Sequence, residues 1–260
     1  MAKGLKYLLL LLLILGCSTE PEPEPEPEPS ICDGLTEVEL WGEWYDIETT
    51  TYINLYGNDK PDLRFDMQFI DLFQDVKGSG FNVFDDAEVI IGINVPNCSE
   101  YSRKQIDELT DFVKKPQIGA KGLVYIKYNK DGTSKSSIDK FYSSDKLLDI
   151  VSKCNSNKGD LVLILAGEKN NTQNALSELR LLMGNKLSLR NPKEFKPVWV
   201  VNFPLLKWNE ELKRFNAMHH PFTSPINEDI SLLDKDPSSV RANAYDLVIN
   251  GVEIGGGSVR

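Results

Sequence analysis

The sequence is poor in histidine and in paired cysteines, the side chains from which most protein zinc sites are built. It has only two histidines, and none of its four cysteines lies in a CxxC or CxxxC pair, so a structural zinc site is not indicated. Four scattered cysteines are also untypical of a small fold held together by disulfides. We therefore expect no metal bound by cysteine, and buried thiols at Cys98 and Cys154.

Positive charge is also scarce. The 29 lysines and arginines are outnumbered by 39 aspartates and glutamates, which leaves a formal net charge of −10. Phosphate binding draws its affinity from clustered basic side chains, so this balance argues against a broad nucleic-acid-binding surface. Any contact with RNA must be local or be made by another part of a larger protein. The apolar fraction of 41% still suffices for one large or two modest globular domains.

The first residues have the pattern of a secretory signal. Lys3 and Lys6 precede a nine-residue apolar run at residues 7–15, which is too short to cross a bilayer of about 30 Å as a stable helix. The run ends in ILGC, which resembles the lipobox of bacterial lipoproteins. The resemblance implies a signal peptide over residues 1–17, lipidation at Cys17 and a membrane lipid anchor.

The next segment, residues 18–55, begins as a tether. Glu-Pro repeats five times over residues 20–29, and alternating proline with charge keeps a chain extended. Residues 31–55 then resemble the entry region of leucine-rich-repeat surface lipoproteins. No repeat with L-x-x-L-x-L spacing follows, so this pattern stops near residue 55.

Residues 73–191 predict an α+β unit. Residues 87–95 are apolar and β-branched, as in a buried strand, and residues 122–128 and 161–166 are further short strands. Apolar residues at helical spacing predict a helix over 102–114. A second, amphipathic helix is expected over 176–187, with one apolar stripe made by Leu176, Leu179, Met183 and Leu187.

Several stretches of sequence resemble bacterial aspartate–tRNA ligases, over about four fifths of the chain. YGNDKPDLRF (56–65) resembles the segment that joins the catalytic domain of these enzymes to a large insertion. SRKQIDELTDFVKK (102–115), GAKGLVYIKY (119–128) and GDLVLILAG (159–167) resemble the GAD insertion domain, which also occurs in an amidotransferase subunit. Residues 198–225 and 241–260, which include AMHHPFTSP and NGVEIGGGSVR, resemble only the ligase.

This resemblance implies a fold and a reaction. The expected fold class is α+β: a linker at 56–72, a GAD-like insertion domain at 73–191 and a partial antiparallel class II catalytic sheet at 192–260. The family activates L-aspartate with ATP and Mg²⁺ and transfers it to tRNA, which implies a cytoplasmic location for this part. The complete enzyme is a homodimer, whereas this stretch lacks the motif that normally forms the dimer and is expected not to dimerise.

The motif match also assigns site residues. His219 falls at the family's aspartate-contacting position, Arg260 at its aspartate-recognising position and Glu253 at an ATP-binding position. A guanidinium group can donate two parallel hydrogen bonds to a carboxylate, which suits Arg260 for selecting aspartate over asparagine. No protein nucleophile is needed, so no catalytic residue is assigned, and adjacent His219 and His220 suit one metal ion poorly.

The remaining charged residues are explained as well by solvent. Asp59, Lys60 and Arg64 fit a solvated turn, and the resemblance gives them no role. Basic residues at 102–104 and 114–115 are most simply a solvated helix face.

The resemblance defines absences too. Class II motifs 1 and 2, the GLDR element of motif 3 and an anticodon-binding domain all fall outside the resembling stretch. We therefore expect a fragment, joined to its leader near residues 55–56, that does not aminoacylate alone and whose last segment is poorly packed. The alternative is a membrane-anchored surface lipoprotein that uses the GAD-like unit as a non-enzymatic binding module. The sequence does not decide whether the family member also charges tRNA for asparagine.

Overall fold

The structure is a computed structural model that describes residues 37–40, 43–46 and 52–260. The expected signal peptide, the lipidation site at Cys17 and the Glu-Pro tether all lie outside the described residues. Strands β1 (Glu37–Leu40) and β2 (Glu43–Asp46) pair antiparallel, and helix α2 (Tyr52–Tyr56) follows. Within the part of the chain that is described, no helix is both long and apolar enough to span a membrane.

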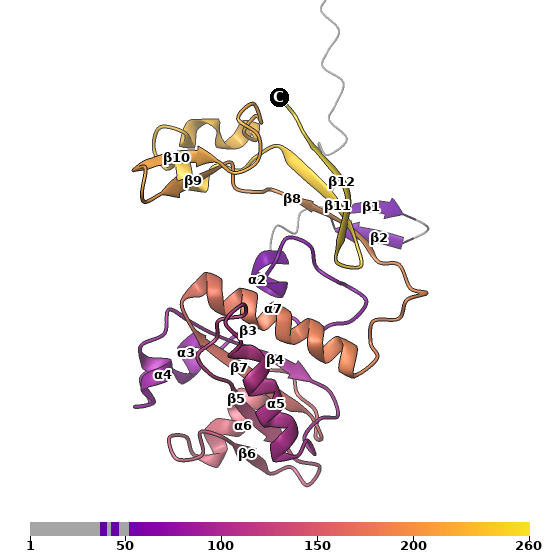
Figure 1. Cartoon of the computed structure of the whole chain (residues 1–260), viewed down its shortest axis with the longest axis vertical. Coiled ribbons are helices and arrows are strands. Elements are labelled where there is room, and N and C mark those ends of the chain that lie inside the picture. The colour runs from indigo at the N-terminus through magenta and orange to yellow at the C-terminus, as the bar shows by residue number, and fades with distance from the viewer. Residues whose placement is uncertain (1–36, 41–42, 47–51) are drawn as a thin grey trace, which may run out of the picture. The chain divides into compact units, whose positions relative to one another are not determined.

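A five-stranded antiparallel sheet forms the centre of the first half of the described chain (Figure 1). Two neighbouring inner strands of this sheet, residues 89–95 and 161–167, pair along their whole length, from Val89↔Gly167 to Val95↔Leu161. Both are nearly continuous apolar runs because each is covered on both faces, as buried strands require. The order of strands is β3 (Ile70–Asp71), β4 (Val89–Val95), β7 (Leu161–Gly167), β5 (Val124–Tyr128) and β6 (Ser134–Ser136).

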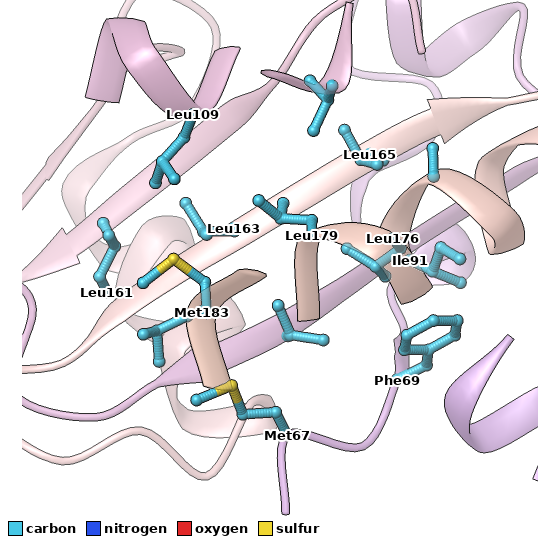
Figure 2. Close-up of a cluster of buried hydrophobic side chains, with 14 of the residues drawn as sticks. Met67, Phe69, Ile91, Leu109, Leu161, Leu163, Leu165, Leu176, Leu179 and Met183 are labelled. Carbon is cyan, nitrogen blue, oxygen red and sulfur yellow. The ribbon is translucent and has the colours of Figure 1, made fainter. Parts of the chain in front are cut away.

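Helices cover both faces of this sheet. Figure 2 shows one of the two cores, in which Leu176, Leu179 and Met183 lie among strand side chains such as Leu163. This core belongs to α5 (Arg103–Val113) and α7 (Lys169–Lys186). The opposite core packs Ile90 and Ile164 against the other helices. Those helices are α3 (Phe73–Val76), α4 (Asn82–Asp85) and α6 (Ser144–Lys153).

The predicted strands and the helix at 102–114 are confirmed, with ends shifted by one or two residues. Helix α7 begins seven residues before the predicted start at 176. The Glu168 side chain accepts hydrogen bonds from the backbone amides of Asn170 and Asn171, which caps the helix at its true start. Helix α6, capped by Ser143, was not predicted. Cys98 and Cys154 are buried free thiols, as expected, and burial raises the pKa of Cys154 to about 12.

A second, three-stranded antiparallel sheet lies in the C-terminal part, with β11 (Ala244–Ile249) between β12 (Val252–Ser258) and β8 (Pro197–Val201). A hairpin of β9 (Leu206–Asn209) and β10 (Arg214–Ala217) and the short helices η1 (Asn227–Leu232) and η2 (Pro237–Ser239) complete this part. The described chain is therefore α+β with antiparallel sheets, as expected.

The expectation that the segment from Val198 onward packs poorly is wrong for one face of this sheet. A separate apolar cluster buries Val198, Val200 and Val248 together with Phe203 and Leu205. The expectation holds for β12, which is an edge strand whose residues Val252 and Ile254 are about 60% exposed. The sheet thus has a packed core and one accessible edge.

Candidate functional site

A segment that is neither helix nor strand, residues 57–69, lies against the turn of the β11–β12 hairpin, and we call it the linker segment. Arg180 of α7 is 1% exposed, and its side chain donates hydrogen bonds to backbone carbonyl oxygens of this segment. Its Nη2 donates to the carbonyl oxygens of Asp62, Phe65 and Asp66 at 2.9, 2.6 and 2.7 Å. Carbonyl oxygens that would otherwise be buried without partners are satisfied in this way, so the linker segment is fastened to α7.

A buried carboxylate fixes the same segment from a second direction. Asp62 has a fully buried side chain whose Oδ2 accepts from Arg64 Nη2 at 2.6 Å and from Arg190 Nε at 2.8 Å. Burial pushes the pKa of Asp62 upward, but the hydrogen bonds from the two arginines outweigh burial and leave this pKa below its usual value. Asp62 is therefore a charged anchor, and its partner Arg64, which the sequence suggested to lie in a solvated turn, has a side chain that is only 9% exposed.

The hairpin of β11 and β12 carries the candidate side chains. Its tight turn is Asn250-Gly251, and both residues have positive φ (55° and 85°), as the favoured two-residue hairpin turns require. The register shifts between Leu247 and Val248, where β12 carries one extra residue. Val248 pairs with Glu253, whereas Asp246 pairs with Gly256.

This bulge decides which side chains share a face. On a regular hairpin with this turn, Gly255 would lie opposite Asp246, and Gly256 would point to the other face of the sheet. The extra residue instead puts Gly256 and Ser258 on the face that Asp246 and Glu253 already share. Beyond β12, Val259 N donates to Asn243 O at 2.9 Å.

Gly256 leaves the space that the Asp246 carboxylate fills. A Cβ at position 256 would lie 2.1 Å from Asp246 Oδ1 and 2.9 Å from the Tyr245 carbonyl oxygen. A Cβ at the neighbouring Gly255 would meet nothing within 4 Å. Gly256 is therefore required, because the Asp246 carboxylate on the adjacent strand fills the space that a Cβ at position 256 would need.

Charged groups gather around Glu253. Its Oε2 lies 3.4 Å from Lys60 Nζ, and the same ammonium group lies 3.0 Å from Asp59 Oδ2. Burial, and then the negative charge of Glu253, raise the pKa of Asp246, while the charges of Lys60 and His219 act in the opposite direction. Glu253, Lys60, His219 and Asp59 therefore all lie near enough to Asp246 for their charges to affect it.

His219 lies on the loop that follows β10. Arg260 lies two residues after the end of β12. The His219 ring lies edge-on to Phe203, with ring centroids 4.7 Å apart. The loop is tied to the end of β12, because Ser224 N donates to Val259 O at 2.8 Å. Arg260 is exposed, and an extended chain separates it from Glu253 by roughly 20 Å. Arg260 therefore lies well apart from Glu253.

Two carboxylates of this site suit a magnesium ion. Mg²⁺ is usually bound through one or two carboxylates together with substrate phosphates, and Asp246 and Glu253 supply two on adjacent strands. Burial, and then the negative charge of Glu253, raise the pKa of Asp246, and a cation near the two carboxylates would act in the opposite direction. Within the described ranges no group of three or more potential metal ligands exists, so phosphates and water would have to complete the shell.

Sequence reasoning missed Asp246, Lys60 and Asp59. A recognisable signal existed for Asp246, since an acidic residue stands on each strand of a hairpin around Asn-Gly, seven positions apart. Lys60 offered none, because its contact with Glu253 arises only in the folded chain.

Comparisons with known proteins show which families this chain resembles. Residues 82–176 match the GAD domain family. The aspartate–tRNA ligase of Porphyromonas gingivalis is 55% identical over 218 residues, 84% of this chain. Those of Bacteroides fragilis and Parabacteroides distasonis are 54% identical over 227 residues (87%) and 57% identical over 206 residues (79%).

The matches cover only part of each relative. This chain spans 36%, 39% and 35% of the length of the three ligases, respectively. It thus contains a GAD domain, and its internal region is homologous to aspartate–tRNA ligases.

Proposed function

We propose that the three-stranded sheet with its flanking loop is part of the aspartate-activating site of an aspartate–tRNA ligase, a fragment of a class II catalytic sheet. Glu253 and Asp246 bind the phosphates of ATP through magnesium, and His219 and Arg260 bind L-aspartate. The observation that carries the proposal is the pairing of β11 with β12, which puts Asp246 and Glu253 on one face of the sheet. The similarity of this region to aspartate–tRNA ligases supports it.

In the proposed reaction the α-carboxylate of aspartate attacks the α-phosphorus of ATP and pyrophosphate leaves. No protein atom forms a bond, so the chain acts by holding the reactants in line and by matching their charges. Arg260 donates to the side-chain carboxylate of aspartate and has no matching acceptor in the amide of asparagine. Magnesium, when bound, neutralises phosphate charge.

Activity of the whole enzyme requires more than this stretch. Because the chain spans little more than a third of its relatives, transfer to tRNA, pairing into a homodimer and a cytoplasmic place of work are proposals about a complete protein. We propose that residues 56–260 alone do not aminoacylate. Each charged contact that is lost at a phosphoryl site commonly costs several kcal/mol, and about 1.4 kcal/mol is tenfold in rate.

A chimeric enzyme tests the proposal. Residues 56–260 would replace the aligned stretch of the Porphyromonas gingivalis ligase, and aspartate-dependent ATP–pyrophosphate exchange would be measured. We expect exchange close to that of the parent, and a loss of about 100-fold or more in Glu253→Gln. Glu210→Gln, on the exposed β9–β10 hairpin, is the matched control and should leave exchange unchanged. A folded chimera without exchange would contradict the proposal.

A further inference from the structure

Lys60 connects the two fixed parts of the site. Its backbone belongs to the linker segment, where Lys60 N donates to Asn58 Oδ1 at 2.8 Å and Asn58 Nδ2 donates to Ser177 Oγ of α7 at 2.7 Å. Its side chain reaches the opposite way, to Glu253 of β12 at 3.4 Å. A residue held by the insertion helix therefore supplies a charge to the catalytic sheet.

Negative charge exceeds positive charge where this ammonium group lies. Asp59 and Glu253 both pair with Lys60, and the charge of Lys60 also acts on Asp246. Two carboxylates thus contact one lysine, and a third lies within reach of its charge, at a site whose proposed ligand is a divalent cation. Without Lys60 the carboxylates of Glu253 and Asp246 would repel each other with less compensation.

We propose that Lys60 is an internal counter-cation of the Asp246–Glu253 carboxylate pair, which stands beside Glu253 until a divalent cation displaces it. The inference rests on the proposed function and adds a positioning residue to it. Lys60 balances the charge of the empty site, keeps Glu253 in place and competes with the incoming metal.

The geometry allows such an exchange. The side chains of Lys60 and Glu253 are 37% and 42% exposed, so their ion pair is screened by solvent and weakly held. When the ammonium group leaves Glu253, Asp59 at 3.0 Å remains as its partner. The four-carbon lysine stem is flexible enough to move between two carboxylates.

The backbone of Lys60 stays in place during this movement. Gly251, at the turn between β11 and β12, lies against the linker segment, since a Cβ built on it would be 3.7 Å from Lys60 O and 3.5 Å from Asp62 Cβ. Asp62 is in turn held by its ion pairs with Arg64 and Arg190. Only the side chain is free to move, so α7 sets the distance from which Lys60 competes.

Binding of Mn²⁺, an ion that electron paramagnetic resonance detects directly, tests the inference on the full chain. We expect Lys60→Met to bind Mn²⁺ about threefold to fivefold more tightly than the wild type, the effect expected of removing a half-exposed ion pair. Lys60→Arg, which keeps the charge, should bind like the wild type. Lys213→Met removes a more exposed lysine–glutamate pair, that with Glu210, and should change nothing.

The gain must depend on Glu253, because other acidic residues also attract Mn²⁺. Lys60→Met combined with Glu253→Gln should lose it, and Lys60→Gln serves if the methionine variant does not fold. Equal or weaker binding by Lys60→Met and Lys60→Gln would overturn the inference and leave the magnesium site standing. No Glu253-dependent binding in any variant would overturn both this inference and the magnesium part of the proposed function.

Discussion

The guanidinium group of Arg180 lies 4.0 Å from the centre of the Phe65 ring and also donates to the Phe65 carbonyl oxygen at 2.6 Å. A second ring, that of Tyr56, lies 4.5 Å away. Burial lowers the pKa of Arg180 to about 10, below its ordinary value, yet leaves it charged at neutral pH. One buried cation thus organises the linker segment that carries Lys60 to the candidate site.

Replacing Arg180 should therefore destabilise the fold. Arg180→Met removes the partners of several buried carbonyl oxygens, and we expect a loss of about 2–4 kcal/mol in the free energy of unfolding. Urea unfolding followed by circular dichroism measures it. Arg103→Met is the control, because Arg103 is 94% exposed, and it should cost less than about 0.5 kcal/mol. Equal stability of the two variants would show that the buried arginine has no anchoring role.

Gly256 and Gly255 form a matched pair for testing the β11–β12 hairpin. Gly256→Ala forces a Cβ to within 2.1 Å of Asp246 Oδ1, and we expect it to destabilise the chain by about 1–3 kcal/mol and to weaken Mn²⁺ binding. Gly255→Ala places its Cβ in open space and should have little effect on either quantity. Thermal unfolding and Mn²⁺ titration of both variants compare them. A similar response at the two positions would contradict the placement of the Asp246 carboxylate.

The ion pair between Asp229 and Arg241 should make the stability of the C-terminal part depend on pH. Asp229 Oδ2 accepts from Arg241 Nε at 2.7 Å, and hydrogen bonds from Arg241 lower the pKa of Asp229 to about 2. A carboxyl group whose pKa is lowered by folding stabilises the protein above its unfolded pKa, near 4, and loses this effect as pH falls toward 2. Asp229→Asn should therefore cost about 1–2 kcal/mol at pH 6.

The comparison of wild type and Asp229→Asn across pH isolates this pair. Urea unfolding at pH 6, 4 and 3 should show a difference between the two proteins that shrinks below pH 4. A difference that stays constant down to pH 3 would mean that Asp229 ionises with an ordinary pKa and that its bonds to Arg241 do not stabilise the folded state.

The parts of the fold that could be predicted are those with a local signal. Strands β4 and β7 are continuous apolar runs, and α5 has apolar residues at helical spacing, so the local pattern of the sequence was sufficient to predict these three elements. The first turns of α7 read KNNTQNA, which has no such stripe, and only the cap at Glu168 marks where the helix begins. Local pattern therefore identified the central strands and α5, but missed the polar start of α7 and the whole of α6, although α6 buries Leu147, Ile150 and Val151.

The candidate site was less accessible from sequence. Glu253, His219 and Arg260 came from resemblance, and their roles remain proposals. Asp246 shares a face with Glu253 across the hairpin around Asn250-Gly251, a pattern that was present in the sequence and was not used. Lys60 depends on a tertiary contact, so the solvated turn was an equally good reading of the same residues.

The most direct test of the account concerns Arg260 in the chimeric ligase. If Arg260 recognises the side-chain carboxylate of aspartate, Arg260→Ala should lower kcat/KM for aspartate in ATP–pyrophosphate exchange by about 100-fold or more and change KM for ATP little. Arg260→Lys keeps the charge without the paired donors, and its kcat/KM for aspartate should lie between that of the unsubstituted chimera and that of Arg260→Ala. An Arg260→Ala enzyme whose kcat/KM for aspartate stays within threefold of the unsubstituted chimera would contradict the account.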